Sequence, residues 1–325
     1  MIQPESVSVK RKLGALAPWI IAAGLLAWLF SRVPLADLGA ALARVSLPVF
    51  LGACVAYVAC SLVVDSAASF VTFRRALPAY PLRYIDAVRL RASTYLFAIL
   101  HYGAGQGGMV YLLHERHGIP ALRAAGAIIL SMGVNALLIA GCASIGLAVG
   151  GTSHAPPAIR TLVLALAAVL PAYLAVVWLR PGFLARRDLL RPLFDAGIVG
   201  NLAIAAARLP HLAVLVAGHF AMMRLFGIHT PPAAALALLP VVFVIGHLPI
   251  SPSGIGTAQA TAVLLFSSFA PGDDAMRRAT VLAYSLSFHF GVIAVEAVIG
   301  LACLRSTWRT GSVASTDAAR RDEST

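Results

Sequence analysis

The chain has 325 residues, of which 60% are hydrophobic and 12% charged, and its formal net charge is +12. Soluble domains carry about 25% charged residues, so this composition excludes a soluble enzyme, a disordered chain and a disulfide-stapled secreted domain. Basic residues in so apolar a chain are typical of the cytoplasmic ends of membrane helices, and we therefore predict no nucleic-acid partner.

The first predicted element is a membrane helix over residues 13–31. Lys10, Arg11 and Lys12 precede this uncharged run. The same order is found in signal peptides, but the run is long enough to cross a bilayer and no convincing small-residue cleavage site follows it. We therefore predict an uncleaved first span with residues 1–12 in the cytoplasm.

Further apolar runs follow in chain order. They cover residues 45–73, 92–114, 124–150, 161–179, 198–223, 225–272 and 281–304. The uninterrupted runs meet the requirement of ~20 residues for a helix that crosses the bilayer. The sequence after Arg305 is polar and rich in small residues, so we predict a disordered cytoplasmic tail over 306–325.

Two of these runs contain helix-breaking residues. The run 92–114 holds four glycines around Gln106, and the run 225–272 is interrupted by prolines and glycines between residues 249 and 256. Backbone groups freed by such breaks persist at membrane depth only inside protein or beside a wet cavity. Each of the two runs could therefore cross the bilayer or turn back within it.

The distribution of Lys and Arg distinguishes these arrangements. If every run crosses, 11 of these residues lie inside and 12 outside, whereas hairpins at 92–113 and 233–270 entering from opposite faces place 18 inside and five outside. The positive-inside rule strongly favours the hairpins. The predicted fold class is therefore an all-α polytopic membrane protein with about six full spans, two broken re-entrant helical elements and both termini in the cytoplasm.

Both breaks share a short pattern. Gly103 and Gly105 form a Gly-x-Gly followed by Gln106, while Gly254 and Gly256 form a second, with Gln259 three residues beyond. Together with insertion from opposite faces, the match indicates an inverted repeat within a single domain. We place this domain at 13–305 and its two halves at about 13–160 and 161–305.

The segment from Leu248 to Gln259, LPISPSGIGTAQ, resembles the signature of the lysylphosphatidylglycerol synthase transmembrane family. These are the flippase-like domains of aminoacyl-phosphatidylglycerol synthases and their stand-alone relatives. Gln106 and Gln259 stand where the family has glutamates, and Met109 stands where it has an arginine. The resemblance implies translocation of a lipid or a lipid-linked substrate. Because the chain ends soon after the last span, we expect no synthase domain.

The second break is the strongest candidate for a ligand site. Glycines expose backbone N–H groups, and a helix that starts near Gly256 offers partial positive charge to a phosphate. The alternative is a kinked helix packed tightly without a ligand, with the glutamines satisfying freed backbone groups. The candidate substrate-binding residues are Ser251, Ser253, Gly254, Gly256, Thr257 and Gln259, with Gly103, Gly105 and Gln106 from the first break and Arg208, which could meet a lipid phosphate.

Ionisable side chains within the apolar runs form a second candidate set. Asp65, His289 and Glu296 are costly at membrane depth and are therefore functional candidates. Asp65 could instead pair with an arginine. His289 and Glu296 are seven residues apart on one helix face, where they could relay a proton or only bond a neighbouring helix.

The remaining charged and ligating residues predict little further chemistry. The histidines are scattered and the cysteines unpaired in spacing, so we expect no metal site and no cofactor. We expect the arginines that precede the first break to contact anionic headgroups of the inner leaflet. They are Arg74, Arg75, Arg83, Arg89 and Arg91.

The leading functional hypothesis is a non-enzymatic, flippase-like transporter in a bacterial inner membrane. Its substrate would be a phosphate-bearing or aminoacylated lipid, or a lipid-linked intermediate. One alternative is an intramembrane serine hydrolase that uses Ser253 with His289, and another is a non-transporting partner of a lipid-modifying enzyme. The sequence also leaves a homo-oligomer open.

Overall fold

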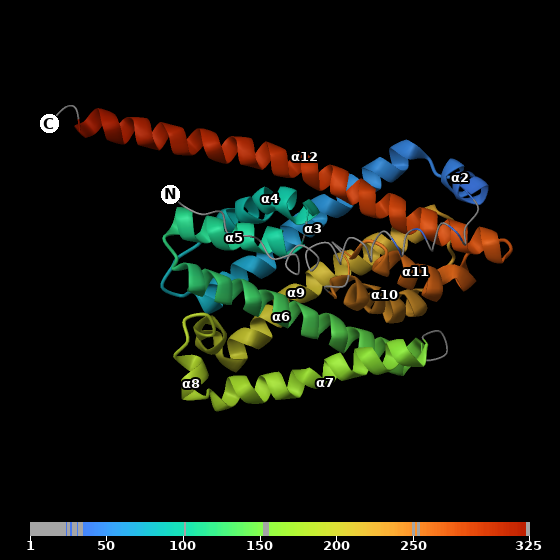
Figure 1. Cartoon of the computed structure of the whole chain (residues 1–325), viewed down its shortest axis with the longest axis horizontal. Helices are drawn as coiled ribbons and strands as arrows, with labels where there is room; N and C mark the ends of the chain where they lie inside the picture. Colours follow the sequence, from blue (N-terminus) through green and yellow to red (C-terminus); the bar gives the residue numbers. More distant parts are fainter. Residues whose placement is uncertain are drawn as a thin grey trace, which may run out of the picture.

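The computed structural model is an elongated bundle of helices without strands among the residues it describes (Figure 1). These residues are 24, 27, 31, 35–100, 102–151, 156–248, 251 and 254–322, without the side chains of 99, 100, 102, 150, 151, 247 and 304–322. Five of the described helices are long and apolar enough to cross a membrane: α3 (Leu47–Ala76), α6 (Ala121–Gly146), α7 (Pro157–Leu179), α9 (Arg191–Leu225) and α12 (Asp274–Asp322). The predicted first span lies almost entirely outside the described residues.

Prolines mark where several helices begin. Pro48, Pro157, Pro192 and Pro232 lie in the first turn of α3, α7, α9 and α10 (Pro232–His247). A proline is favourable there because the first N–H groups of a helix have no partner within the helix. The helix boundaries therefore follow directly from the sequence at these four positions.

Both broken runs form helical hairpins. The first consists of α4 (Tyr84–Leu100) and α5 (Tyr102–His117), and the second of α10 and α11 (Thr257–Phe266); in each pair the two helices pack on one another. Figure 1 shows the two hairpins at opposite ends of the bundle. The predicted all-α polytopic membrane fold is therefore confirmed, while insertion of the two hairpins from opposite faces of the membrane stays a prediction.

The order of elements recurs along the chain. A long helix, a hairpin and a second long helix follow one another as α3, α4–α5 and α6, and again as α9, α10–α11 and α12. α3 packs against α9 through the middle of the bundle and runs in the opposite direction (Figure 1). This order suits an inverted repeat, while the predicted boundary between the halves stays a prediction.

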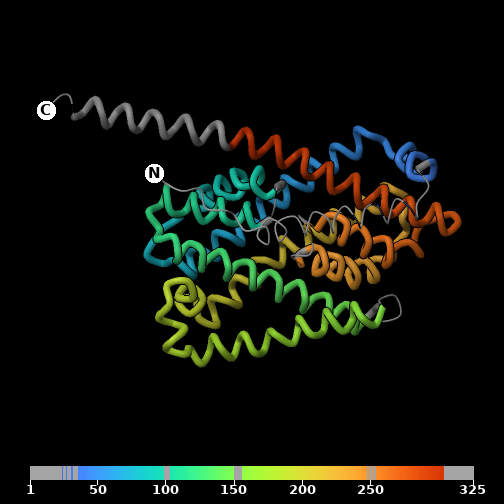
Figure 2. The backbone as a smooth tube through the Cα atoms, viewed as in Figure 1, coloured from blue at the N-terminus to red at the C-terminus, as the bar shows by residue number. Residues whose placement is uncertain are grey.

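Some elements differ from the sequence-based expectation. The predicted disordered tail over residues 306–325 stays a prediction. The short helices α2 (Leu35–Ala43), α8 (Gly182–Ala185) and η3 (Ser267–Phe269), and the π-helical end of α6, η1 (Leu147–Gly151), were not predicted. Figure 2 shows α12 running beside α4 and α2 along the bundle.

Much of the apolar surface faces outward. On α7, Leu164, Val169, Trp178 and Leu179 are between 48% and 75% exposed, although the helix is strongly hydrophobic. A continuous exposed apolar face is unfavourable in water and suited to contact with lipid tails. Polar side chains collect instead at the centre of the bundle, where the hairpins end.

Candidate functional site

A cavity of about 430 Å³ lies between the two hairpins. Ala98, Gly105 and Gln106 line it from the turn of the first hairpin, while Ser251 and Gly254 line it from the turn of the second. α3, α6, α9 and α12 contribute the remaining walls. Two segments about 150 residues apart in the sequence therefore share one central compartment.

A buried ionic cluster forms one wall of the cavity. Asp65 on α3 pairs with Arg91 on α4 and with Arg208 on α9. Arg208 also donates a hydrogen bond to Ser131 on α6, and Asp65, Arg208 and Ser131 are each less than 8% exposed. A carboxylate at this depth is tolerated because two guanidinium groups compensate its charge. The cluster joins four helices.

Two further side chains extend this cluster. The Nδ1 atom of His211 lies 4.0 Å from Oδ1 of Asp65. The other ring nitrogen of His211 lies 3.3 Å from the hydroxyl of Ser61 on α3. Both residues line the cavity, so the polar wall presents a hydroxyl and an imidazole beside the ionic groups.

α12 contributes His289 and Glu296 to the lining. Next to them, Nδ1 of His219 on α9 lies 2.7 Å from the hydroxyl of Tyr284 on α12. The rings of Phe243 and Phe288 pack on His219 at centroid distances of 5.1 and 4.9 Å. The cavity therefore has a charged region near Asp65 and an aromatic region near His219.

The turn of the second hairpin is held by its own hydrogen bonds. Ser251 and Thr257 share a hydroxyl–hydroxyl bond of 3.0 Å, and Thr257 donates to the carbonyl of Gly254 at 3.1 Å. Gly254 and Gly256 have φ values of +73° and +87°, a region that other residues rarely adopt. Two positive φ values and the hydroxyl bonds give the turn a defined shape.

Gln259 has a structural partner in this turn. Its Oε1 atom accepts a hydrogen bond of 2.6 Å from the backbone N–H of Gly256, and the side chain is 1% exposed. Gln259 was considered either as a ligand for the substrate or as a hydrogen-bond partner for backbone groups freed by the break. The contact with the Gly256 N–H group corresponds to the second role. The same bond occupies the Gly256 N–H group that was expected to face a phosphate.

The glycines of the first hairpin serve its packing. A Cβ atom on Gly105 would lie 2.8 Å from the Cβ atom of Ala98, so α4 and α5 meet closely at this point. Gln106 is half-buried and lines the cavity. Gly103 is exposed and is not part of the cavity lining.

The structure brings most of the predicted residues together. Eight of them line the central cavity: Ser251, Gly254, Gly105, Gln106, Arg208, Asp65, His289 and Glu296. Gly256 and Thr257 support the turn from behind, and Gln259 lines an adjoining pocket of about 150 Å³. Ser253 lies outside the described residues.

The sequence interpretation placed Arg91 wrongly and missed several neutral residues. Arg91 was expected to contact headgroups, but its side chain is 15% exposed and pairs with Asp65. The available signal was the position of Arg91, which lies about two turns into α4 and directly before its uncharged part. Ser61, Ser131, Asn135, His211 and His219 also line the cavity and were not singled out as site residues.

The described part of the chain holds no group of three or more His, Cys, Asp or Glu side chains that could bind a metal ion. The cavity is instead lined by guanidinium groups, by the carboxylates of Asp65 and Glu296, and by imidazoles and hydroxyls. Such an assortment suits a headgroup that carries both a phosphate and hydrogen-bonding groups.

Comparison with known families gives a match over most of the chain. A family profile described as "Lysylphosphatidylglycerol synthase TM region" matches residues 15–300. Comparison with curated proteins gave no significant match. The matched range contains both hairpins and every residue of the central cavity.

Proposed function

Since the chain belongs to the lysylphosphatidylglycerol synthase transmembrane-region family, and is thus an integral membrane protein with a lipid-related role, we propose that it moves a phosphate-bearing lipid across the membrane. The observation that carries this proposal is the shared cavity. Hairpins from opposite ends of the bundle contribute their turns to one polar compartment. Broken helices that meet in this way are typical of alternating-access transporters.

The chemistry of the cavity supports a lipid headgroup as the substrate. Arg91 and Arg208 both line the cavity beside the carboxylate of Asp65, and the planar guanidinium group of arginine matches the geometry of a phosphate. Glu296 on α12 provides a carboxylate for an ammonium group, such as that of an aminoacylated headgroup. The aromatic region around His219 provides an apolar boundary for the glycerol and upper acyl chain.

We propose the bacterial inner membrane as the location, with both termini in the cytoplasm. The bundle end where α3, α5 and α7 finish carries most of the described arginines, among them Arg74, Arg75, Arg116 and Arg180. The positive-inside rule orients this end toward the cytoplasm. The first hairpin then enters from the cytoplasmic face and the second from the periplasmic face.

Translocation is tested in proteoliposomes with headgroup-labelled phosphatidylglycerol and lysylphosphatidylglycerol. We expect the protein to speed the exchange of at least one of these lipids between leaflets, measured by accessibility of the label to a membrane-impermeant reagent. Movement of neither lipid above the rate in protein-free vesicles would contradict the proposal.

A cavity-filling variant gives this assay a matched control. Ile293 on α12 lines the cavity, whereas Val298 on the same helix is 69% exposed. Ile293→Trp should abolish most of the translocation because the indole occupies the substrate space, while Val298→Trp should leave the rate unchanged. Equal rates for the two variants, both melting like the parent, would exclude a path through the cavity.

A further inference from the structure

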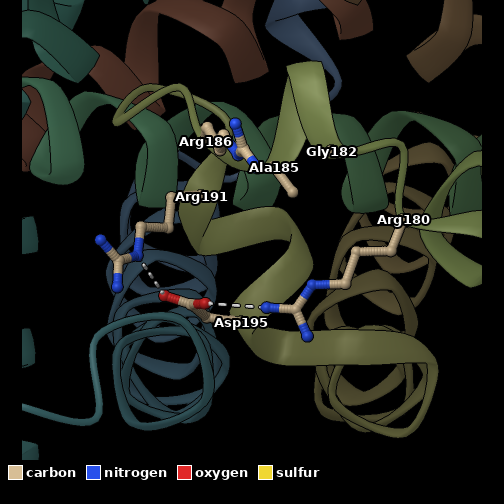
Figure 3. A pocket seen from close by; sticks show the side chains of 6 residues that line it. All are labelled: Arg180, Gly182, Ala185, Arg186, Arg191 and Asp195. Carbon is tan, nitrogen blue, oxygen red and sulfur yellow. Dashed lines mark ion pairs between the residues drawn. The ribbon is translucent and has the colours of Figure 1, made fainter.

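A second pocket lies at the corner where α7 ends, α8 follows and α9 begins. Its volume is about 460 Å³, and it shares no lining residue with the central cavity. The lining is mostly basic and consists of Arg180, Gly182, Ala185, Arg186, Arg191 and Asp195. Figure 3 shows Asp195 between Arg180 and Arg191, with Arg186 on the other side of the pocket.

The charges of this corner pocket do not cancel. Three guanidinium groups face one carboxylate, which leaves a formal excess of two positive charges. The contacts from Asp195 to Arg180 and to Arg191 are both 3.6 Å, longer than a hydrogen bond of ~2.7–3.2 Å. Arg186 makes no ion pair among the described residues. N–H donors of all three arginines are therefore open to an anionic ligand.

The backbone of the corner is packed against the bundle. A Cβ atom on Gly126 of α6 would lie 2.1 Å from the carbonyl oxygen of Leu189, so α6 directly supports the turn that carries Arg186 and Arg191. The backbone N–H of Arg191 also bonds the carbonyl of Arg187 at 2.8 Å. The arginines thus project from a firmly supported segment rather than from a free loop.

The surroundings of the corner pocket are apolar. The candidate span α7 ends at Leu179 and the candidate span α9 begins at Arg191. Trp178, Leu179 and Phe183 are between 70% and 75% exposed beside the arginines. Exposed aromatic side chains next to basic residues at the end of a span are typical of the membrane interface. A ligand here meets a positive pocket and an apolar wall together.

We infer that this corner pocket binds the headgroup of an anionic phospholipid from the surrounding bilayer. The phosphodiester oxygens accept hydrogen bonds from Arg180, Arg186 and Arg191, and the acyl chains lie along Trp178 and Phe183. Asp195 holds two of the arginines in place but also repels the phosphate. The site is separate from the translocation cavity, and its occupancy does not depend on transport.

Trp178 provides a local probe for this lipid. In a variant with Trp19→Phe, Trp28→Phe and Trp308→Phe, fluorescence comes from Trp178, two residues before Arg180. In reconstituted bilayers, brominated phosphatidylglycerol should quench it at a lower mole fraction than brominated phosphatidylcholine. A basic residue near an anionic headgroup contributes enough that Arg186→Gln should reduce this preference about fivefold.

Two further variants sharpen the test. Asp195→Asn should strengthen the preference for phosphatidylglycerol, because it removes the repelling charge. Arg160→Gln, an exposed arginine at the other end of α7, should leave the preference unchanged. The inference is overturned if the two brominated lipids quench equally, or if Arg160→Gln matches Arg186→Gln. Displacement of the lipid by millimolar glycerol phosphate would also overturn it, by indicating a site for soluble phosphate.

Discussion

Asp65 is the residue on which the centre of the bundle depends most directly. It compensates Arg91 and Arg208, which come from two different helices and lie far apart in the sequence. Burial makes each of these charges unfavourable alone, so the cluster stabilises the fold only while it is complete. The arrangement explains how a carboxylate is retained inside an apolar run of α3.

Removing this carboxylate should destabilise the protein strongly. Asp65→Asn replaces the carboxylate that Arg91 and Arg208 share with a neutral amide, and we expect a loss of about 3–5 kcal/mol in the free energy of unfolding. Equilibrium unfolding by SDS in mixed micelles measures the loss.

Asp188→Asn is the matched control for Asp65→Asn. Asp188 is 59% exposed and lies 3.9 Å from Arg123, so its removal should cost at most about 1 kcal/mol. Similar losses for the two variants would show that the buried cluster contributes no more than a surface pair.

Gln259 illustrates a residue whose role depends on a single backbone contact. Gln259→Ala removes the acceptor for the Gly256 N–H group, and we expect a loss of about 1 kcal/mol, as for other helix-capping residues. Gln259→Glu keeps a side-chain oxygen at the same place and, in acidic buffer where the buried carboxyl is uncharged, should retain most of the stability. Thermal unfolding in detergent distinguishes the two, and equal losses would argue against a capping role.

At the scale of elements, the second hairpin depends on a close approach between its two arms. A Cβ atom on Gly254 would lie 2.7 Å from the carbonyl oxygen of Gly246, at a φ of +73°. Gly254 is thus constrained by both its backbone conformation and its neighbour. This constraint brings the turn against the end of α10.

Gly254→Ala should therefore disturb the hairpin. We expect a loss of about 1–3 kcal/mol in stability together with slower lipid translocation, because the turn that lines the cavity shifts. Gly133→Ala on α6 is the control, since its added Cβ meets nothing within 4 Å in a helix and should stabilise slightly. Unfolding in mixed micelles and the vesicle assay report the two effects, and a neutral Gly254→Ala would contradict this view of the turn.

The hairpins were predictable from the sequence because charge and helix breakers each report a local property. Lys and Arg are enriched in the loops on the cytoplasmic side, so their distribution indicates which loops share a face of the membrane. Clustered glycine and proline indicate a break in a helix wherever they occur. The partners of Arg91 and His211 were not predictable, because both meet Asp65 only when α4 and α9 pack on α3. Neutral Ser131 carried no signal at all, since its partner is 77 residues away.

At the scale of the whole molecule, the arrangement of spans predicts which loops share a face of the membrane. Glu115 at the end of α5 and Asp273 before α12 are both exposed and lie at opposite ends of the bundle (Figure 1). In a variant without its native cysteines, a cysteine at 115 should be protected from impermeant thiol reagents in intact cells. A cysteine at 273 should react.

This labelling experiment separates the two arrangements of the broken runs. If all runs crossed the bilayer, residue 115 would lie outside and would react in intact cells. A cysteine replacing the exposed Asp188 is a second reporter and should behave like residue 115, because the loop after α7 lies on the same side as residue 115 in both arrangements. Reaction of residue 115 but not of residue 273 would contradict the proposed orientation.

The ionic cluster also means that the two hairpins are attached to the rest of the bundle in different ways. Arg91 ties the first hairpin to α3, whereas the hydrogen bonds of Ser251, Thr257 and Gln259 stay within the second hairpin. Moving the first hairpin requires separating buried charges, whereas the hydrogen bonds described for the turn of the second hairpin can move with it. The activation barriers for opening toward the two faces of the membrane should therefore differ, and the slower opening should limit each transport cycle.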